Sequence, residues 1–504
     1  MTHCMALVQL FAAVVLVVPA TPPSTAQSHV PRFERSDCLV NGNWVGDLRR
    51  ECGWLVVPES RDRTGGRTVR LAVEIFRSRT PSGAPPLVFL HGGPGGAGGI
   101  RLFSEGVARS PLPLHRDVVI YDQRGAGFSE PKLCPAYERV ADAVYNVRDD
   151  AEQARRLTAG QRACVAELAA QGVDRLAYST EESVADLIDL RRTLGYSSWQ
   201  IYGGSYGARL AQEAMARDER AIDAVVLASP AARGFSTRAR QPLSTQRAFE
   251  RVFAACRLQA SCRDAFPSVE QDFYAAYDDL AASPLPVPIV RPDSGRDTVW
   301  FDGQRLVSDV RDRILNRPRP MVGRLPLLLH ELRAGEGDRL RAAREIVGAG
   351  TAPGAVADHV LRELINCHDH DTYGTAYRKT LDSVNAVVRP PFRRAIAREC
   401  DEWLPGLADR AMGAPVRSDI PTLILTGHFD DRTPTENARR IASTLSRVYL
   451  VEMPDEGHDG RALGCHGVIL TQFVEHPTQP PDTSCVATIP PIQFTTTWEP
   501  ARVP

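Results

Sequence analysis

The sequence has 504 residues, of which 43% are hydrophobic and 24% are charged, and its formal net charge is -1. These values describe an ordinary globular protein with enough chain to bury a large core. The near-neutral charge and the lack of a contiguous basic patch argue against a nucleic-acid partner.

The first residues have the composition of a secretory signal. An apolar run from Ala6 to Val18 is followed by small residues and prolines up to Ala26, although no Lys or Arg precedes the run. This pattern predicts a signal peptide at residues 1–26 and a secreted or periplasmic protein. The run is shorter than the ~18 to 20 apolar residues of a membrane span, so we expect no stable membrane insertion after signal cleavage. The alternative is an uncleaved N-terminal anchor.

Cysteine usage agrees with export. Apart from Cys4 in the predicted signal, the chain has ten cysteines and no close Cys-x-x-Cys pair, which favours disulfides in an oxidising compartment over a zinc site. Free buried thiols are the alternative. The sequence does not fix the connectivity, and our hypothesis is pairing between nearest neighbours. The expected pairs are Cys38–Cys52, Cys134–Cys164, Cys256–Cys262, Cys367–Cys400 and Cys465–Cys485.

The first part of the chain predicts strands that lead to a glycine-rich loop. Residues 69–76 alternate apolar and polar side chains, and residues 85–90 are an uninterrupted apolar run, as in a central strand buried on both faces. The loop from His91 to Gly96 follows directly. A loop of this kind after a central strand can lend a backbone N–H to an oxyanion hole. We expect Gly93 to be one donor and Tyr206 the second.

A second strand runs into a Gly-x-Ser-x-Gly turn. Residues 199–202 predict a short strand, Gly203 to Gly207 form the turn, and residues 208–217 are good helix formers. The bare motif also occurs in ordinary loops, but a strand before it and a helix after it are the context of an exposed nucleophile. Ser205 is therefore the candidate nucleophile.

The alternation of strands and helices predicts an α/β fold with a mostly parallel central sheet and helices on both faces. A helix is expected at residues 181–194 and a strand at 225–228. From residue 233 the pattern becomes helical, with proline-rich breaks, and strands resume at 421–427 and 447–452. We expect a catalytic core at 27–232 and 418–504, interrupted by a helical cap insertion at 233–417.

Two further residues complete a candidate catalytic triad. Serine catalysis needs a histidine as general base and a carboxylate that orients it. Asp430 lies in a turn just after a predicted strand, with Asp431 as its rival, and His458 lies in a glycine-flanked loop after the last strand. The order Ser, Asp, His is the one typical of α/β-hydrolases.

Five linked motifs resemble one group within the α/β-hydrolases, the secreted bacterial proline iminopeptidases and tripeptidyl aminopeptidases. The motifs are His91 to Gly96, Asp122 to Ser129, Gly203 to Gly207, Asp430 to Pro434, and Gly457 with His458. The resemblance implies an α/β-hydrolase fold with Ser205 as nucleophile, Asp430 as acid and His458 as base. It also implies release of short N-terminal pieces from peptides.

Three functions remain open on the sequence alone. The first is a secreted serine exopeptidase that works through an acyl-enzyme, and the second is a carboxylesterase or lipase with the same triad. The third is a non-catalytic binding protein of the same fold. The expected partner is a peptide or a small ester, and we expect a monomer without cofactor or metal. The cluster from Cys367 to His370 is read as a disulfide beside a polar loop.

Overall fold

The computed structural model describes most of the chain between residues 31 and 498. The described residues are 31–40, 44–45, 48–63, 65–96, 98–144, 147–291, 295–315, 319–348, 358–369, 374–393, 400–405, 413–454, 456–458 and 464–498. The predicted signal peptide at residues 1–26 lies outside them. All the candidate site residues lie within them.

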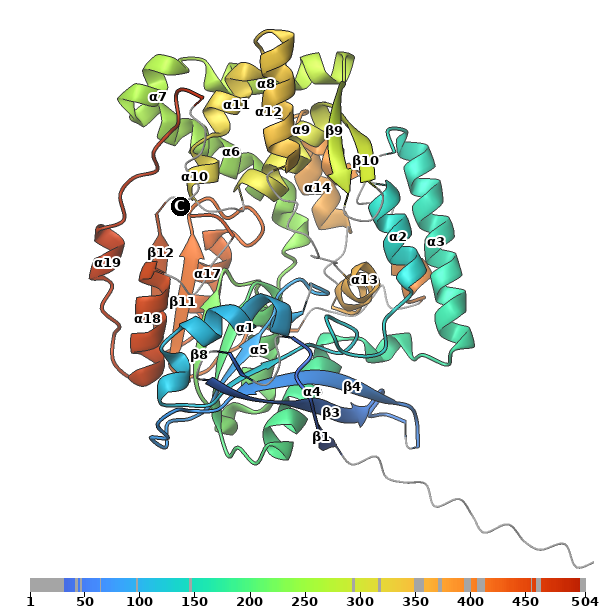
Figure 1. Ribbon diagram of the computed structural model, residues 1–504, viewed down its shortest axis with the longest axis vertical. Helices are drawn as coiled ribbons and strands as arrows, with labels where there is room; N and C mark the ends of the chain where they lie inside the picture. Colours follow the sequence, from blue (N-terminus) through green and yellow to red (C-terminus); the bar gives the residue numbers. More distant parts are fainter. Residues whose placement is uncertain are drawn as a thin grey trace, which may run out of the picture.

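The protein is built on one ten-stranded sheet (Figure 1). The strand order is β1-β3-β4-β6-β5-β7-β8-β11-β12, and β2 pairs with β3. The pairs β1–β3, β3–β4 and β4–β6 are antiparallel, and all pairs from β6 to β12 are parallel. The strands are β1 (Arg32–Ser36), β2 (Trp44–Val45), β3 (Leu48–Pro58), β4 (Thr68–Phe76), β5 (Leu87–Leu90), β6 (Val118–Tyr121), β7 (Trp199–Gly204), β8 (Ile222–Ala228), β11 (Thr422–Gly427) and β12 (Val448–Met453).

Helices cover both faces of this sheet. On one face α4 (Thr180–Thr193), α5 (Tyr206–Arg217) and α17 (Thr435–Ala442) share a buried apolar cluster with the strands. On the other face α1 (Gly99–Arg109) and α18 (Gly464–Glu475) do the same. Every residue of β5 and β6 is buried, as expected for strands covered on both sides. The predicted α/β fold with a mostly parallel sheet is confirmed.

The chain between β8 and β11 forms a second, mainly helical region, which stands at one end of the sheet (Figure 1). Its own apolar cluster is separate from the two that line the sheet. Its helices are α6 (Gln241–Leu258), α7 (Ala260–Ala265), α8 (Val269–Ala282), α9 (Gly303–Val310), α10 (Arg319–Val322), α11 (Leu325–Glu331), α12 (Glu336–Gly348), α13 (His359–His368), α14 (Thr375–Ser383), α15 (Arg389–Arg393) and α16 (Cys400–Trp403). A π-helical turn, η6 (Arg311–Leu315), continues α9.

The proline-rich segment that we expected to be a break is a strand. β9 (Leu285–Arg291) pairs antiparallel with β10 (Gly295–Phe301), and Pro286 and Pro288 lie within β9. In a two-stranded sheet each strand is an edge, where a residue without an N–H is tolerated. The prolines therefore do not prevent the pairing.

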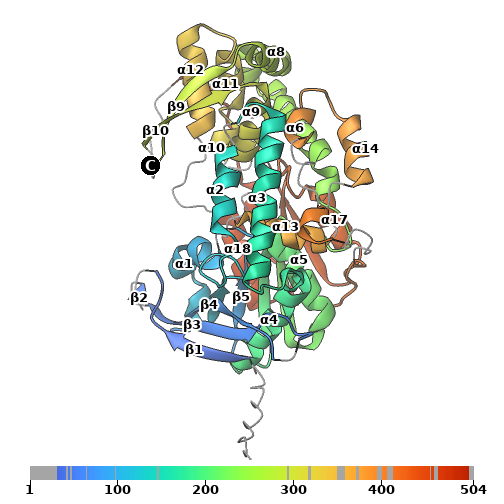
Figure 2. The same ribbon diagram turned by 90° about the vertical axis from the view of Figure 1, so that its right-hand side faces the viewer.

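A helical pair from the first part of the chain also packs against this region. α2 (Pro135–Ala143) and α3 (Asp150–Ala170) stand upright beside the sheet and reach the helical region (Figure 2). α2 contacts α13, and α3 contacts α16. α2 and α3 lie within the core segment predicted at 27–232, and no pattern in the sequence indicated these contacts.

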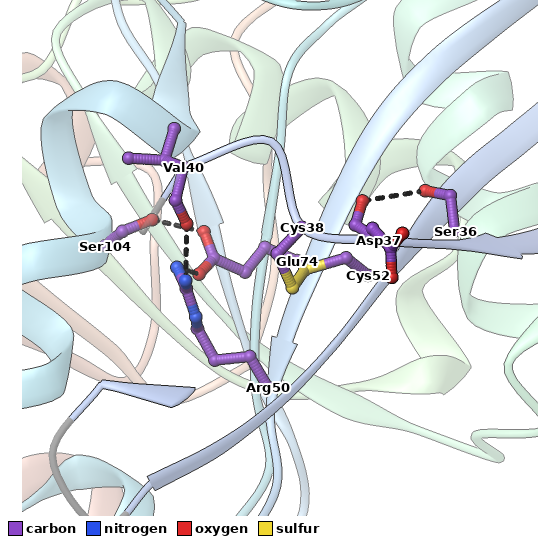
Figure 3. The surroundings of a disulfide bond; sticks show 8 residues. All are labelled: Ser36, Asp37, Cys38, Val40, Arg50, Cys52, Glu74 and Ser104. Atoms are coloured by element: carbon purple, nitrogen blue, oxygen red, sulfur yellow. Dashed lines mark hydrogen bonds and ion pairs between the residues drawn. A yellow bond between two sulfur atoms is a disulfide. The ribbon is translucent and has the colours of Figure 1, made fainter. Parts of the chain in front are cut away.

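The structure contains the five disulfides of the nearest-neighbour hypothesis. Around Cys38–Cys52 a polar network is buried between the sheet and α1 (Figure 3). Arg50 pairs with Glu74 and donates to the carbonyl of Val40, and the Ser104 hydroxyl donates to Glu74. The Arg50 and Glu74 side chains are 1% and 2% exposed.

The remaining helical pieces are short. α19 (Ser484–Ala487) follows α18, and the 3-10 turns are η1 (Leu112–Leu114), η3 (Arg175–Ala177), η4 (Glu219–Ala221) and η5 (Arg238–Arg240). Within the described part of the chain, every helix is too short or too polar to span a bilayer.

Candidate active site

Ser205 occupies the tight turn between β7 and α5. Its backbone has φ 55° and ψ -119°, a region that residues with a side chain rarely adopt. The neighbouring glycines make the turn possible. A Cβ on Gly203 would lie 2.4 Å from the carbonyl oxygen of Gly207, and one on Gly207 would lie 2.2 Å from that of Leu90. The turn therefore holds the serine in the strained conformation of an exposed nucleophile.

His458 lies between the serine and a carboxylate. Its Nε2 is 3.0 Å from the Ser205 Oγ, and its Nδ1 is 2.9 Å from Oδ2 of Asp430. A carboxylate on the Nδ1 side favours the tautomer with its proton on Nδ1, which leaves Nε2 free to accept the serine proton. The structure thus brings together the three residues that the sequence selected from segments far apart in the chain.

The Asp430 carboxylate is fully buried and held by its own turn. Oδ1 accepts from the backbone N–H groups of Arg432 at 2.9 Å and Thr433 at 2.8 Å, and Oδ2 accepts from the Thr433 hydroxyl at 2.8 Å. Burial alone would raise the pKa of Asp430, but the adjacent His458 and these hydrogen bonds outweigh it and lower the pKa below its ordinary value. Asp430 is therefore ionised and fixed in orientation.

The rival carboxylate points elsewhere. Asp431 accepts from the Thr245 hydroxyl at 2.6 Å and pairs with Arg311 at 2.8 Å, both in the helical region. Asp430, and not Asp431, is therefore the carboxylate that contacts His458. The sequence offered no signal for Thr433, whose hydroxyl also lies 3.0 Å from Nδ1 of His458.

The glycine-rich loop passes directly against the nucleophile. A Cβ on Gly92 would lie 2.9 Å from the Ser205 Cβ, and Gly93 has φ 123°, a conformation that favours glycine. Tyr206 is the first residue of α5, where a helix leaves its N–H groups without intrahelical partners. Both expected oxyanion donors thus belong to segments that flank Ser205.

The side chains of Tyr206 and His91, in these two segments, are both buried and uncharged at neutral pH. The Tyr206 hydroxyl is 2.6 Å from Oγ1 of Thr180, which donates to Asp369 at 2.6 Å. Burial, together with the Asp369 charge, raises the pKa of Tyr206. Burial also lowers the pKa of His91 to about 4, so this imidazole is neutral at neutral pH. Neither side chain is suited to act as a base at that pH.

The start of helix α13 packs against the glycine-rich loop. The N–H of Asp358, just before α13, donates to the carbonyl of Gly95 at 2.8 Å, and its Oδ2 accepts from the N–H of Gly127 at 3.1 Å. Gly127 belongs to the loop of the Asp122 to Ser129 motif. Within that motif Asp122 accepts from the N–H groups of Ile100 and Phe128, so its role is structural.

No metal site is evident in the part of the chain that the structure describes, where no group of three or more His, Cys, Asp or Glu side chains could hold an ion. In the cluster that begins at Cys367, the cysteine is bonded to Cys400, and Asp369 accepts from Thr180. His370 lies outside the described residues.

The sheet order and the strand-turn-helix at Ser205 define the α/β-hydrolase fold. The family model of the alpha/beta hydrolase fold matches residues 85–265, and that of the TAP-like proteins matches residues 389–485. Ser205 falls in the first segment, and Asp430 and His458 fall in the second. These matches, together with the curated relatives, support the resemblance to the proline iminopeptidases and tripeptidyl aminopeptidases that the linked motifs predicted.

The curated relatives match over part of their length. A proline iminopeptidase of Xanthomonas citri is 31% identical over 126 residues, which are 25% of this chain and 26% of that protein. A tripeptidyl aminopeptidase of Streptomyces coelicolor is 28% identical over 186 residues, 34% of this chain and 33% of that protein. The chain thus spans between a quarter and a third of these relatives.

Solved structures give a weaker likeness. The crystal structure of a proline iminopeptidase of Mycobacterium smegmatis is 15% identical and covers 84% of this chain and 98% of its own, with a TM-score of 0.40. A TM-score this low adds nothing to the fold assignment.

Proposed function

We propose that the protein is an exported serine exopeptidase that releases single residues or short peptides from the N-termini of peptide substrates. The observation that carries the proposal is the hydrogen-bonded array in which His458 joins Ser205 to the buried Asp430. The names of the curated relatives, proline iminopeptidase and tripeptidyl aminopeptidase, support a peptide substrate. The five disulfides and the signal-like N-terminus support export.

In this mechanism Ser205 Oγ attacks the scissile carbonyl while its proton passes to Nε2 of His458. The C=O π electrons move to the oxygen, and the N–H groups of Gly93 and Tyr206 stabilise that oxyanion; each such donor contributes ~2.7 to 4 kcal/mol. The tetrahedral intermediate then collapses, the C–N bond breaks, and His458 returns its proton to the leaving amine.

The acyl-enzyme left on Ser205 is an ester. Water attacks it with His458 again as the base, and the released acid carries the former N-terminal residues. Asp430 stays ionised throughout and stabilises the imidazolium that forms in each half-reaction. The sum of acylation and deacylation is the hydrolysis of one peptide bond by one water molecule.

The helical region supports the choice of an exopeptidase. It places α13 on the glycine-rich loop and Arg311 on the turn that follows Asp430, so helices stand beside both ends of the triad. Helices beside the triad would admit a chain end more readily than the middle of a folded chain. The same triad would also cleave an ester, so the choice between a peptide and an ester substrate depends on the experiment that follows.

The test compares substrates that differ in one group. Aminoacyl and tripeptidyl nitroanilides with a free amine are measured beside their N-acetylated forms and a short-chain nitrophenyl ester. We expect turnover of the free-amine anilides and its loss in Ser205→Ala. Ser268→Ala is the matched control, because Ser268 is exposed and makes no capping hydrogen bond at the start of α8.

Equal rates on blocked and free substrates would overturn the exopeptidase proposal. Ester cleavage alone would move the function to an esterase. Failure of a fluorophosphonate to label Ser205 would remove the catalytic proposal altogether.

A further inference from the structure

The turn that carries the catalytic acid is held by the helical region. Asp430 faces His458, whereas the next two side chains face the opposite way. Oδ2 of Asp431 accepts from the Thr245 hydroxyl in α6 at 2.6 Å and from Nε of Arg311 at 2.8 Å. Arg432 donates to Oδ1 of Asp312 at 3.0 Å. Two adjacent residues of the turn, Asp431 and Arg432, thus pair with two adjacent residues of η6, Arg311 and Asp312. The acidic residue comes first in the turn, and the basic residue comes first in η6.

The residue before the acid is anchored in the same region. Phe429 is 3% exposed and belongs to the apolar cluster of the helical region, although it follows the sheet strand β11. Its N–H donates to the carbonyl of Glu456 at 2.7 Å, two residues before His458. The segment from Phe429 to Arg432 is therefore fixed to the helical region by one aromatic side chain and two ion pairs.

The partner turn has an unusual backbone. Arg311 and Asp312 begin η6, a π-helical turn, and such turns are rare and frequent at functional sites. The other end of η6 is firmly packed, because Ile314 and Leu315 are fully buried in the apolar cluster of the helical region. The Arg311 guanidinium also lies 5.2 Å from the Phe392 ring. A displacement of η6 would consequently be transmitted to the acid turn.

The acid depends on the backbone of that turn. Asp430 Oδ1 accepts from the N–H groups of Arg432 and Thr433, and Arg432 is itself one of the two residues that η6 holds. A rotation of the turn would move these donors and the carboxylate together. Misplacement of a catalytic group by ~1 Å can cost ~100-fold in rate.

We propose that Arg311 and Asp312 are positioning residues for the catalytic acid: they hold the turn at 429–433 so that Asp430 meets His458 only while the helical region is seated on the sheet. The inference rests on the proposed serine hydrolase function and goes beyond it. It assigns to the helical region a part in assembling the triad, in addition to covering it.

The experiment measures kcat and KM for a short-chain nitrophenyl ester, which needs little binding beyond the acyl pocket, with active sites titrated by a fluorophosphonate. Arg311→Gln is expected to lower kcat by about 10- to 100-fold with KM changed less than about two-fold, and Arg311→Lys is expected to recover part of the loss. The control is Arg341→Gln, whose ion pair with Glu331 lies wholly within the helical region.

A second pair of variants covers the case in which Arg311→Gln does not fold. Asp312 and Arg432 are 41% and 40% exposed, so their charges can be exchanged at a partly solvated site, where Asp312 also lies 3.6 Å from Arg311. Asp312→Arg alone is expected to lower kcat, because it breaks the pair with Arg432 and places a second cation beside Arg311. Asp312→Arg with Arg432→Asp is expected to recover part of the loss. The circular dichroism spectrum and Tm of each variant show that it is folded.

The inference is overturned if wild type is active and Ser205-dependent while Arg311→Gln and Asp312→Arg keep the kcat of Arg341→Gln. It is also overturned if the exchanged double variant is no better than Asp312→Arg. If wild-type protein neither turns over any substrate nor reacts with the fluorophosphonate, the proposed function itself fails, and that result differs from the previous two.

Discussion

The backbone of Asp358 rests on the backbone of Gly95. The two residues share a hydrogen bond of 2.8 Å from the Asp358 N–H to the Gly95 carbonyl, and a Cβ on Gly95 would lie 2.2 Å from the Asp358 carbonyl oxygen. Gly95 also has φ 64°, where a side chain adds strain. The glycine-rich loop beside Ser205 therefore meets the start of α13 with no room between them.

Gly95→Ala tests this contact. The new methyl group must push α13 away from the loop, so we expect a lower Tm and a kcat reduced at least several-fold. Gly106→Ala in α1 is the matched control, because a Cβ there meets nothing within 4 Å. That variant should keep its activity and gain up to ~1 kcal/mol of stability from helix propensity. Equal behaviour of the two variants would contradict the contact.

Asp358 should also make stability depend on pH. Burial, with further contributions from Glu138 and Asp122, raises its pKa from 3.8 to about 6, although the Gly127 N–H and Lys132 act in the opposite direction. Between these pH values the unfolded chain has lost this proton while the folded protein keeps it. Stability from this group is therefore present below pH 3.8 and is lost as pH rises to about 6. The loss is at most ~3 kcal/mol, and partial exposure reduces it.

Asp358→Asn isolates this contribution. The amide oxygen can still accept from the N–H of Gly127, but the side chain carries no charge at any pH. The Tm of the variant minus that of wild type should rise between pH 4 and pH 6, values that bracket the shifted pKa of Asp358, and stay level above. A difference that is constant over this range would show that the carboxyl group ionises normally in the folded protein.

Thr433→Val tests how the proposed catalytic acid, Asp430, is supported. Valine keeps the shape of threonine and removes the hydroxyl that donates to Asp430 at 2.8 Å, a charged hydrogen bond contributing ~1.5 to 3 kcal/mol. Because this bond helps to lower the pKa of Asp430, its loss should make the variant less stable than wild type at neutral pH, and the difference should narrow as pH falls below the ordinary aspartate pKa of 3.8. The measurement is the Tm of both proteins against pH. Thr471→Val in α18, whose hydroxyl donates to the Gly467 carbonyl, should show no such pH dependence.

Replacing one partner of the buried Arg50–Glu74 pair should destabilise the protein more than replacing both partners. Arg50→Met leaves the Glu74 carboxylate buried without its cation, which we expect to cost ~3 to 5 kcal/mol. Arg50→Met with Glu74→Leu removes both charges, and its loss should be clearly smaller. Chemical denaturation of the three proteins checks the order. A double variant as unstable as the single one would show that the network around Cys38–Cys52 contributes more than the pair itself (Figure 3).

The strands and the three residues at the site were predictable because each depends on a local pattern. A short apolar run bounded by glycines, such as residues 85–90, is typical of a central strand buried on both faces, and β5 covers Leu87–Leu90. The glycines on both sides of Ser205 are required by the backbone itself. His458 and Asp430 follow predicted strands, so their place at one edge of the sheet could be inferred without knowing any distance.

What could not be predicted depends on contacts between distant segments. Nothing near Asp431 in the sequence shows that Arg311 lies beside it, and the choice between Asp430 and Asp431 needed the direction of each side chain. The same holds for Asp358 on Gly95. The hairpin of β9 and β10 was missed for another reason, because proline is a reliable breaker only where a strand needs its N–H.

The placement of the disulfides gives the molecule two separate chemical sensitivities. Within the described residues each bond closes a short stretch of chain, with the two cysteines at most 33 positions apart in the sequence, and each joins elements that lie side by side. The helical region and the sheet are instead held together by ion pairs, hydrogen bonds and apolar contacts such as those of Asp431 and Phe429. A reducing agent would therefore destabilise the sheet and the helical region individually, by breaking their disulfides. Salt and acid would instead weaken the ion pairs between the helical region and the sheet.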